Sequence, residues 1–196
     1  MKVVAFNGSS RKDGNTAILI RAVFDELEKE GIETELVQLA GQNIHGCIAC
    51  RKCFAEKNEK CAQTNDIVNG CIGKMAKADG IILGSPVYFG NVTPEIKALI
   101  DRSGFVGRAN DNMFARKAGA AVVAVRRAGG AHVFNSLNMF FLITQMIIPG
   151  SNYWNIGYGR EIGEVKSDKE GMETMRVLGQ NMAWLVKELH NGDKKV

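Results

Sequence analysis

The stretch Asn7-Gly8-Ser9-Ser10-Arg11-Lys12-Asp13-Gly14-Asn15-Thr16 decides how this chain folds. An apolar run, Val3 to Phe6, comes directly before it. After it, apolar residues recur at the three- or four-residue spacing of a helix, at Ala17, Ile20, Phe24 and Leu27. The pattern therefore predicts a strand, a loop and a helix in that order.

The residue types of this loop favour a bound phosphate. The beginning of a helix offers unpaired N–H groups and a positive dipole end. Gly8 and Gly14 let the backbone wrap closely, and the loop's hydroxyls, with Arg11 or Lys12, can hold an anion. The loop is not a nucleoside-triphosphate loop, since Asn15 stands where that motif needs lysine, and it lacks Gly-x-Gly-x-x-Gly. A solvated, serine-capped turn is the alternative.

Size and composition indicate one ordinary globular domain over residues 1–196. The hydrophobic fraction is 45% and the charged fraction 23%, both usual values. The net charge of +4 is mild, so no nucleic-acid partner is expected.

A location in the cytoplasm, away from membranes, is expected from two features. The chain goes directly into a strand, with no charged segment and cleavage site before it. Its longest apolar run, Met139 to Ile148, is too short to span a bilayer. Five cysteines in a reducing compartment then point to a metal site or catalysis more than to disulfides.

The rest of the chain alternates between expected strands and helices. Further strands are predicted at 34–39, 80–84, 118–125 and 153–156. Further helices are predicted from a cap at Asp66 to Lys77, from 93 onward, at 131–147 and at 169–189. The long segment 40–65 has little periodicity. Alternation of this kind gives an α/β fold: a flavodoxin-like, doubly wound, five-stranded parallel sheet in three layers.

Ligands of such sheets bind at the carboxyl ends of the strands, where the loops 7–16, 85–92 and 126–130 meet. In the second of these loops, Tyr88 and Phe89 stand between Pro86 and Gly90. Their rings can stack on a flat ligand, while the backbone of Gly90 and Asn91 bonds its edge. Aromatic rings that simply cover the sheet end are the alternative. Together with the phosphate loop, this pattern indicates a flat ring carrying a phosphate, namely FMN.

Four cysteines lie within the irregular segment, at Cys47, Cys50, Cys53 and Cys61. Three of them in compact series can direct thiolates at one face of a metal cluster, which Cys61 closes from the other side. Zinc, a redox dithiol and unliganded cysteines remain alternatives. Cys71 follows on a predicted helix and is interpreted as a small buried residue.

These motifs together resemble the iron–sulfur flavoproteins, a branch of the NADPH-dependent FMN reductase and flavodoxin-like superfamily. The resemblance runs from Gly8 to about Gly130, and the spacing of the four cysteines is its most specific part. It implies that the FMN-binding residues are Ser9, Ser10, Arg11, Gly14, Asn15, Thr16, Pro86, Val87, Tyr88, Phe89, Gly90, Asn91, Arg126, Gly129 and Gly130. It also implies that a [4Fe-4S] cluster is bound by Cys47, Cys50, Cys53 and Cys61.

The resemblance further implies an oxidoreductase that passes electrons between cluster and FMN. Its donor or acceptor would be a small molecule or a ferredoxin-like protein, with NAD(P)H as a transient donor, and it would form a homodimer or homotetramer. The alternatives are a cluster-free NAD(P)H-dependent FMN or quinone reductase and an electron carrier without turnover. No Ser/His/Asp or Cys/His set is present, so no catalytic side chain is assigned. The helix expected at 131–147 is apolar nearly all round, which predicts that part of it lies in an oligomer interface.

Overall fold

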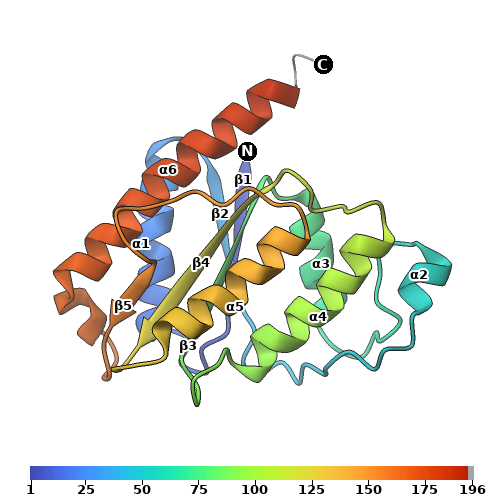
Figure 1. The fold of residues 1–196 in the computed structure, drawn as a ribbon, viewed down its shortest axis with the longest axis horizontal. Helices are drawn as coiled ribbons and strands as arrows, with labels where there is room; N and C mark the ends of the chain where they lie inside the picture. Colours follow the sequence, from blue (N-terminus) through green and yellow to red (C-terminus); the bar gives the residue numbers. More distant parts are fainter. Residues whose placement is uncertain (194–196) are drawn as a thin grey trace.

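A computed structural model describes residues 1–193 and confirms the expected parallel sheet. Five parallel strands are ordered β2-β1-β3-β4-β5, as in flavodoxin-like folds (Figure 1). The strands are β1 Lys2–Asn7, β2 Glu33–Gln38, β3 Gly80–Pro86, β4 Ala118–Val125 and β5 Ile156–Tyr158. The helices are α1 Asn15–Lys29, α2 Lys52–Glu56, α3 Val68–Lys77, α4 Pro94–Ala109, α5 Gly130–Ile143 and α6 Lys169–Asp193, with a 3-10 turn at Glu164–Ser167.

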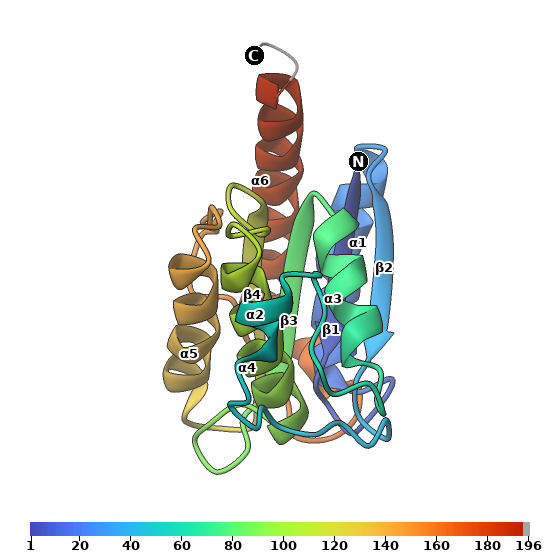
Figure 2. The ribbon, with the colours of Figure 1, turned by 90° about the vertical axis from the view of Figure 1, so that its right-hand side faces the viewer.

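Helices cover both faces of the sheet, which gives the three predicted layers. One hydrophobic core lies between the sheet and α1 with α6, and the other lies between the sheet and α3, α4 and α5 (Figure 2). The strand β4 is buried along its whole length, because it faces helices on both sides. Its sequence accordingly is a continuous run of small and branched apolar residues, without alternation.

This topology brings three loops to one edge of the sheet. The strands β1, β3 and β4 run in the same direction and end at Asn7, Pro86 and Val125. The loops that follow these residues therefore meet at the lower edge in Figure 1, beside the beginnings of α1, α4 and α5.

The fifth strand lies later in the chain than predicted. The prediction of 153–156 was wrong, because Tyr153 and Trp154 pack on one another with their rings 4.9 Å apart and remain exposed. Pairing with β4 begins only at Ile156, opposite Val123, and ends at Tyr158, opposite Val125. The loop at the carboxyl edge therefore begins at residue 159.

One predicted helix ends earlier than expected. The helix expected at 131–147 stops at Ile143, because the Thr144 hydroxyl bonds the Phe140 carbonyl and Gln145 takes a left-handed backbone, φ 61°. The helix expected after a cap at Asp66 runs from Val68 to Lys77, and the Asp66 carboxylate accepts the Val68 backbone N–H at 3.1 Å, as expected of a cap. Inside the irregular segment 40–65, α2 forms a single short turn that was not predicted.

No helix within residues 1–193 combines the length and the apolar character that a bilayer crossing needs. The last three residues of the predicted domain, 194–196, lie outside the part of the chain that the structure describes.

Candidate functional site

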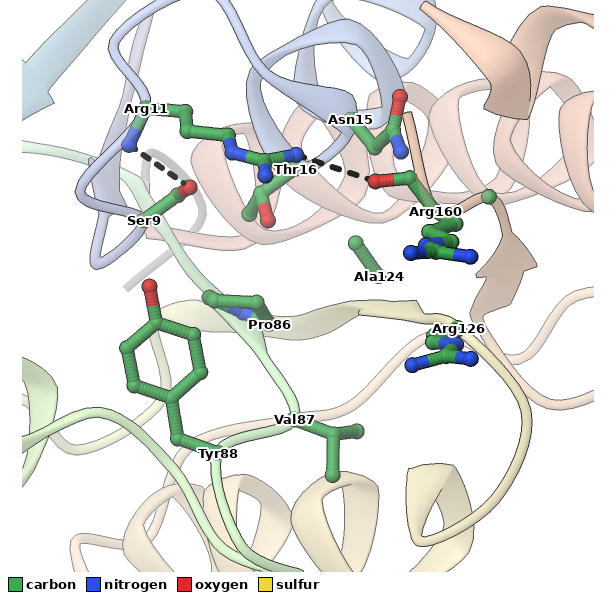
Figure 3. A pocket seen from close by; sticks show the side chains of 11 residues that line it. Ser9, Arg11, Asn15, Thr16, Pro86, Val87, Tyr88, Ala124, Arg126 and Arg160 are labelled. Atoms are coloured by element: carbon green, nitrogen blue, oxygen red, sulfur yellow. Dashed lines mark hydrogen bonds between the residues drawn. The ribbon is translucent and has the colours of Figure 1, made fainter. Parts of the chain in front are cut away.

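A cavity of about 320 Å³ opens at the carboxyl edge of the sheet, where the three loops meet (Figure 3). Its size falls in the usual range for small-molecule sites. It is lined by Ser9, Arg11, Asn15, Thr16, Pro86, Val87, Tyr88, Ala124, Arg126, Gly159 and Arg160. Eight of these residues are among the predicted FMN-binding residues.

The phosphate loop is held in shape by its own side chains. The Asn7 carboxamide oxygen accepts the Ser9 N–H at 3.0 Å, and the Ser9 hydroxyl accepts the Arg11 N–H at 3.2 Å. The loop then turns at Gly14, and α1 begins at Asn15 with its first N–H groups beside the cavity. The loop and the beginning of α1 thus have the arrangement that an anion site at this position needs.

The hydroxyl of Thr16 has no hydrogen-bond partner within residues 1–193, although the residue is only 1% exposed. A buried hydroxyl without a partner costs free energy that a ligand oxygen recovers. Thr16 lines the cavity in the first turn of α1, where a phosphate would sit (Figure 3). The unpaired hydroxyl therefore fits the phosphate of FMN.

The charges around the cavity suit an anion. Arg11, Arg126 and Arg160 line it, and its lining includes no acidic residue. The Arg11 guanidinium donates to the Arg160 carbonyl at 3.0 Å, so the first loop and the loop after β5 are joined across the cavity. Asn15 also joins them: its carboxamide bonds the Glu161 carbonyl and the Gly163 N–H, each at 2.9 Å.

The two aromatic residues of the loop after β3 lie in different surroundings. Tyr88 lines the cavity, and its hydroxyl lies 2.6 Å from the Ser10 hydroxyl. Phe89 is fully exposed to solvent, at a left-handed backbone position with φ 48°, and does not line the cavity. Within residues 1–193, Phe89 therefore does not lie against the cavity that is predicted to hold the flavin ring.

The remaining predicted residues do not line the cavity. These residues are Ser10, Gly14, Gly90, Asn91, Gly129 and Gly130. Gly129 has φ 87°, and a Cβ there would lie 2.9 Å from the Val87 side chain, so glycine is needed where the third loop passes the second. Sequence reasoning missed Ala124, Gly159 and Arg160, the last two because they follow the displaced fifth strand.

All four cysteines of the irregular segment line a second, smaller cavity of about 70 Å³. The backbone wraps around it through left-handed residues at Ala49 and Arg51, with φ 53° and 55°. Cys53 lies on α2, which packs on α4 through an edge contact of Phe54 and Phe105, their rings 6.2 Å apart. The cavity therefore lies between α4 and the irregular segment 40–65, which we call the cysteine segment.

The cysteines surround this cavity without converging on a point. Within residues 1–193, no three His, Cys, Asp or Glu side chains are grouped closely enough to hold one metal ion. Burial raises the pKa of the Cys53 thiol, because the apolar surroundings disfavour its thiolate form. Cys71 is buried in the core, where burial raises its pKa to about 11, as expected for an inert packing residue.

The doubly wound fold, with a cationic, Thr-lined cavity at its carboxyl edge, defines a flavin-binding protein of the flavodoxin-like class. The chain belongs to the NADPH-dependent FMN reductase family, which it matches over residues 1–161. It is therefore a flavin-dependent oxidoreductase that uses FMN.

The similar proteins include several iron–sulfur flavoproteins. An iron–sulfur flavoprotein of Methanocaldococcus jannaschii is 41% identical over 193 residues, which cover 95% of this chain and 98% of that protein. One from Methanosarcina thermophila is 32% identical over 177 residues, which cover 89% and 90%. The resemblance found from the motifs is thereby confirmed.

Solved structures share this fold at low sequence identity. RosB, crystallised with 8-demethyl-8-formylriboflavin-5'-phosphate, aligns with a TM-score of 0.74 at 19% identity over 97% of this chain and 81% of that one. An NAD(P)H:quinone oxidoreductase from Methanothermobacter marburgensis aligns with a TM-score of 0.67 at 13% identity over 93% and 96%. At these identities the likeness shows the fold alone.

Proposed function

We propose that this protein passes electrons between a [4Fe-4S] cluster and FMN, exchanging them with an external donor or acceptor. The observation that carries the proposal is that Cys47, Cys50, Cys53 and Cys61 line one small cavity beside α4. Thiolates of a cubane cluster each bind a different iron, so they surround a volume and do not meet at one ion. The cysteine arrangement suits a cluster better than a single zinc ion, which needs its ligands close together.

The flavin would be held by the residues of the larger cavity. The start of α1, with Thr16 and Arg11, would bind the phosphate, and the ring would lie between Pro86 to Tyr88 and the loop that carries Arg126. Bound FMN supplies one- and two-electron chemistry, which joins the single-electron steps of a cluster to two-electron donors. The protein contributes position and charge: Arg126 and Arg160 favour anionic forms of the ring and phosphate.

The decisive experiment is purification under anaerobic conditions, with iron and acid-labile sulfide measured against flavin. We expect about four irons per chain together with flavin absorbance. A Cys50→Ser variant is expected to lose iron and keep FMN, because the two cavities have no lining residue in common. Cys71→Ala, at a buried cysteine outside the cavity, is the matched control and is expected to keep both.

Other outcomes would favour the other candidates. FMN without iron, even after reconstitution, would make the protein a cluster-free FMN or quinone reductase, for which the flavin cavity is sufficient. Sustained NAD(P)H oxidation by the purified protein would exclude an electron carrier without turnover. A location in the cytoplasm stays a prediction.

The partner most directly supported is a second copy of the chain. Met139, Leu142 and Ile143 lie on one side of α5 and are 67%, 60% and 58% exposed. A contiguous apolar helix face of this kind favours a homodimer or homotetramer. Sedimentation velocity is expected to show an oligomer at micromolar concentration, and monomer alone would contradict the interface.

Replacing Thr16 with valine is expected to weaken FMN binding about 10- to 100-fold. The substitution removes one hydrogen bond to a charged phosphate, worth about 1.5–3 kcal/mol. Since the Thr16 hydroxyl has no partner in the protein itself, the FMN-free variant should be at least as stable as the wild type. Fluorescence titration with FMN measures the effect, and Thr16→Ser, which keeps the hydroxyl, should bind nearly as well as the wild type. Equal affinity of Thr16→Val would place the phosphate elsewhere.

A further inference from the structure

Arg102 is a charged residue with a side chain that is 0% exposed, on the face of α4 that meets the cysteine segment. Its carboxylate partner, Asp66, is also 0% exposed. Burying an ion pair costs desolvation free energy, which the attraction between the two charges offsets only in part. An apolar residue would fill the same space at a lower cost in free energy. Stability alone therefore does not explain why this guanidinium is buried, and its contacts indicate a specific role.

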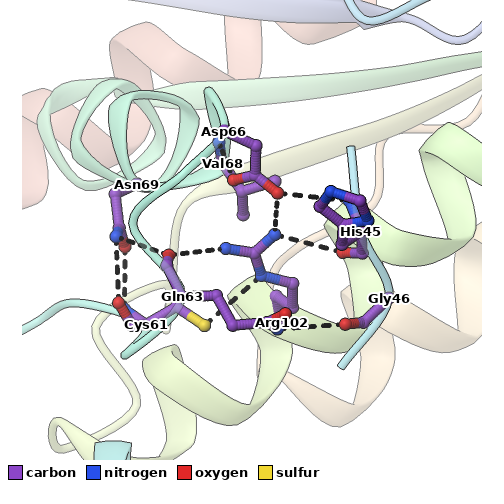
Figure 4. A network of polar contacts seen from close by, with 8 residues as sticks. All are labelled: His45, Gly46, Cys61, Gln63, Asp66, Val68, Asn69 and Arg102. Carbon is purple, nitrogen blue, oxygen red and sulfur yellow. Dashed lines mark hydrogen bonds and ion pairs between the residues drawn. The ribbon is translucent and has the colours of Figure 1, made fainter. Parts of the chain in front are cut away.

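Three of the four hydrogen bonds of the Arg102 guanidinium go to the segment 40–65, and the fourth goes to Asp66 directly after it (Figure 4). Its Nε donates to the Cys61 Sγ at 3.3 Å. Its Nη1 donates to the His45 carbonyl at 3.1 Å and to the Asp66 carboxylate, and its Nη2 donates to the Gln63 carbonyl at 2.9 Å. One side chain on a helix thus holds the part of the segment before Cys47 and the part after Cys61.

Cys61 is fixed from a second side by α3. The Asn69 carboxamide accepts the Cys61 N–H at 2.8 Å and donates to the Cys61 carbonyl at 2.9 Å. Cys61 is also the only buried member of the four. It is therefore anchored to two packed helices, whereas Cys47 and Cys50 lie on the wrapped loop.

We propose that Arg102 is a positioning residue for the cluster: it sets the place of the Cys61 sulfur and, through the Nε–H···Sγ bond, raises the reduction potential of the cluster. This inference rests on the proposed cluster. Hydrogen bonds to ligand sulfurs and nearby positive charge favour the reduced cluster, which carries one more negative charge. Asp66 orients the guanidinium, so that its Nε faces the sulfur and not the solvent.

The test uses FMN-containing protein, prepared anaerobically with ¹⁵N-labelled arginine and reduced for pulsed EPR. Three proteins are compared: wild type, Arg102→Lys and Arg51→Lys. Arg102→Lys keeps the charge but cannot donate to all four acceptors. Arg51 also lines the cysteine cavity, so Arg51→Lys is the matched control. The midpoint potentials of cluster and flavin are measured by redox titration of the same samples.

We expect ¹⁵N coupling to the reduced cluster in the wild type and Arg51→Lys, and its loss in Arg102→Lys. The cluster midpoint should shift to more negative potential only in Arg102→Lys, with the flavin midpoint unchanged. Absence of ¹⁵N coupling in the wild type, or an unchanged midpoint in cluster-loaded Arg102→Lys, would overturn the inference. If Arg102→Lys binds FMN but no cluster, its cluster potential cannot be measured. The ¹⁵N coupling of the wild type then supports the inference if it is present and overturns it if it is absent. Wild type that holds no iron would overturn the proposed function itself.

Discussion

Replacing Asp66 with alanine is expected to lower the free energy of unfolding by about 3–5 kcal/mol. The substitution leaves the Arg102 guanidinium buried without its carboxylate, and it also removes the acceptor of the His45 and Val68 N–H groups. Urea unfolding followed by circular dichroism measures the change, with both proteins free of cofactor, because bound ligands add their own stabilisation. The matched control is Asp101→Ala on α4, whose exposed pair with Lys97 is worth no more than about 0.5 kcal/mol.

The Asp66 contribution should also depend on pH in a defined direction. Burial raises the pKa of this carboxyl, but hydrogen bonds from Arg102, His45 and Val68 outweigh burial and hold the pKa below its ordinary value. A depressed pKa in the folded state means that the stabilisation is complete above the unfolded value of about 3.9 and is lost as the pH falls through the folded value. The difference between wild type and Asp66→Ala should be constant from pH 5 to 7 and shrink below about pH 4. A difference that grew in acid would contradict this assignment.

Replacing Gly8 with alanine is expected to destabilise the protein by about 3 kcal/mol and to impair FMN binding. A Cβ at this position would lie 2.2 Å from the Ile96 side chain and 2.6 Å from the Thr93 hydroxyl. Both residues are fully buried at the start of α4, so neither can move without disturbing the core. Overpacking of this kind costs about 1–3 kcal/mol, and here it also displaces the loop that precedes the phosphate site.

Urea unfolding and FMN titration measure the effect of Gly8→Ala, and Gly73→Ala is its control. Gly73 lies in the middle of α3 with nothing within 4 Å of its added Cβ, so alanine there should stabilise the protein by about 1 kcal/mol. If Gly8→Ala and Gly73→Ala changed the free energy of unfolding in the same direction, the close contact between Gly8 and α4 would not be the cause of the Gly8→Ala effect.

The sequence predicted the lining of the larger cavity well where strong periodic signals flank a loop. The loop after β1 lies between an apolar strand and an amphipathic helix, so its place at the sheet edge follows from the pattern alone. Arg160 was missed because β5 has only three residues, which are too few for a periodic signal. The aromatic residues Tyr153 and Trp154 also resemble a strand in the sequence, so the strand was predicted too early, at the exposed bend before β5. A three-residue strand is specified by pairing with β4, which a local pattern does not contain.

Arg102 was missed for a different reason. An arginine in an amphipathic helix is ordinarily interpreted as a solvent-facing residue. Leu99 and Val106 nevertheless place position 102 on the apolar face of α4, three residues after the first and four before the second. A charge on the apolar face of a helix was the available signal, and its partner Asp66, 36 residues earlier, could be identified only from the fold.

The two bonds of Asn15 have a consequence for the timing of biosynthesis. They join the first helix to Glu161 and Gly163, partners 146 and 148 residues further along the chain. Gly159 and Arg160, which close the cavity, come from the same late segment. A nascent chain emerges from the ribosome with its N-terminal part first. The phosphate loop is made among the first residues, but the cavity is complete only when the segment after β5 has been made. FMN is therefore expected to bind near the end of synthesis or after it.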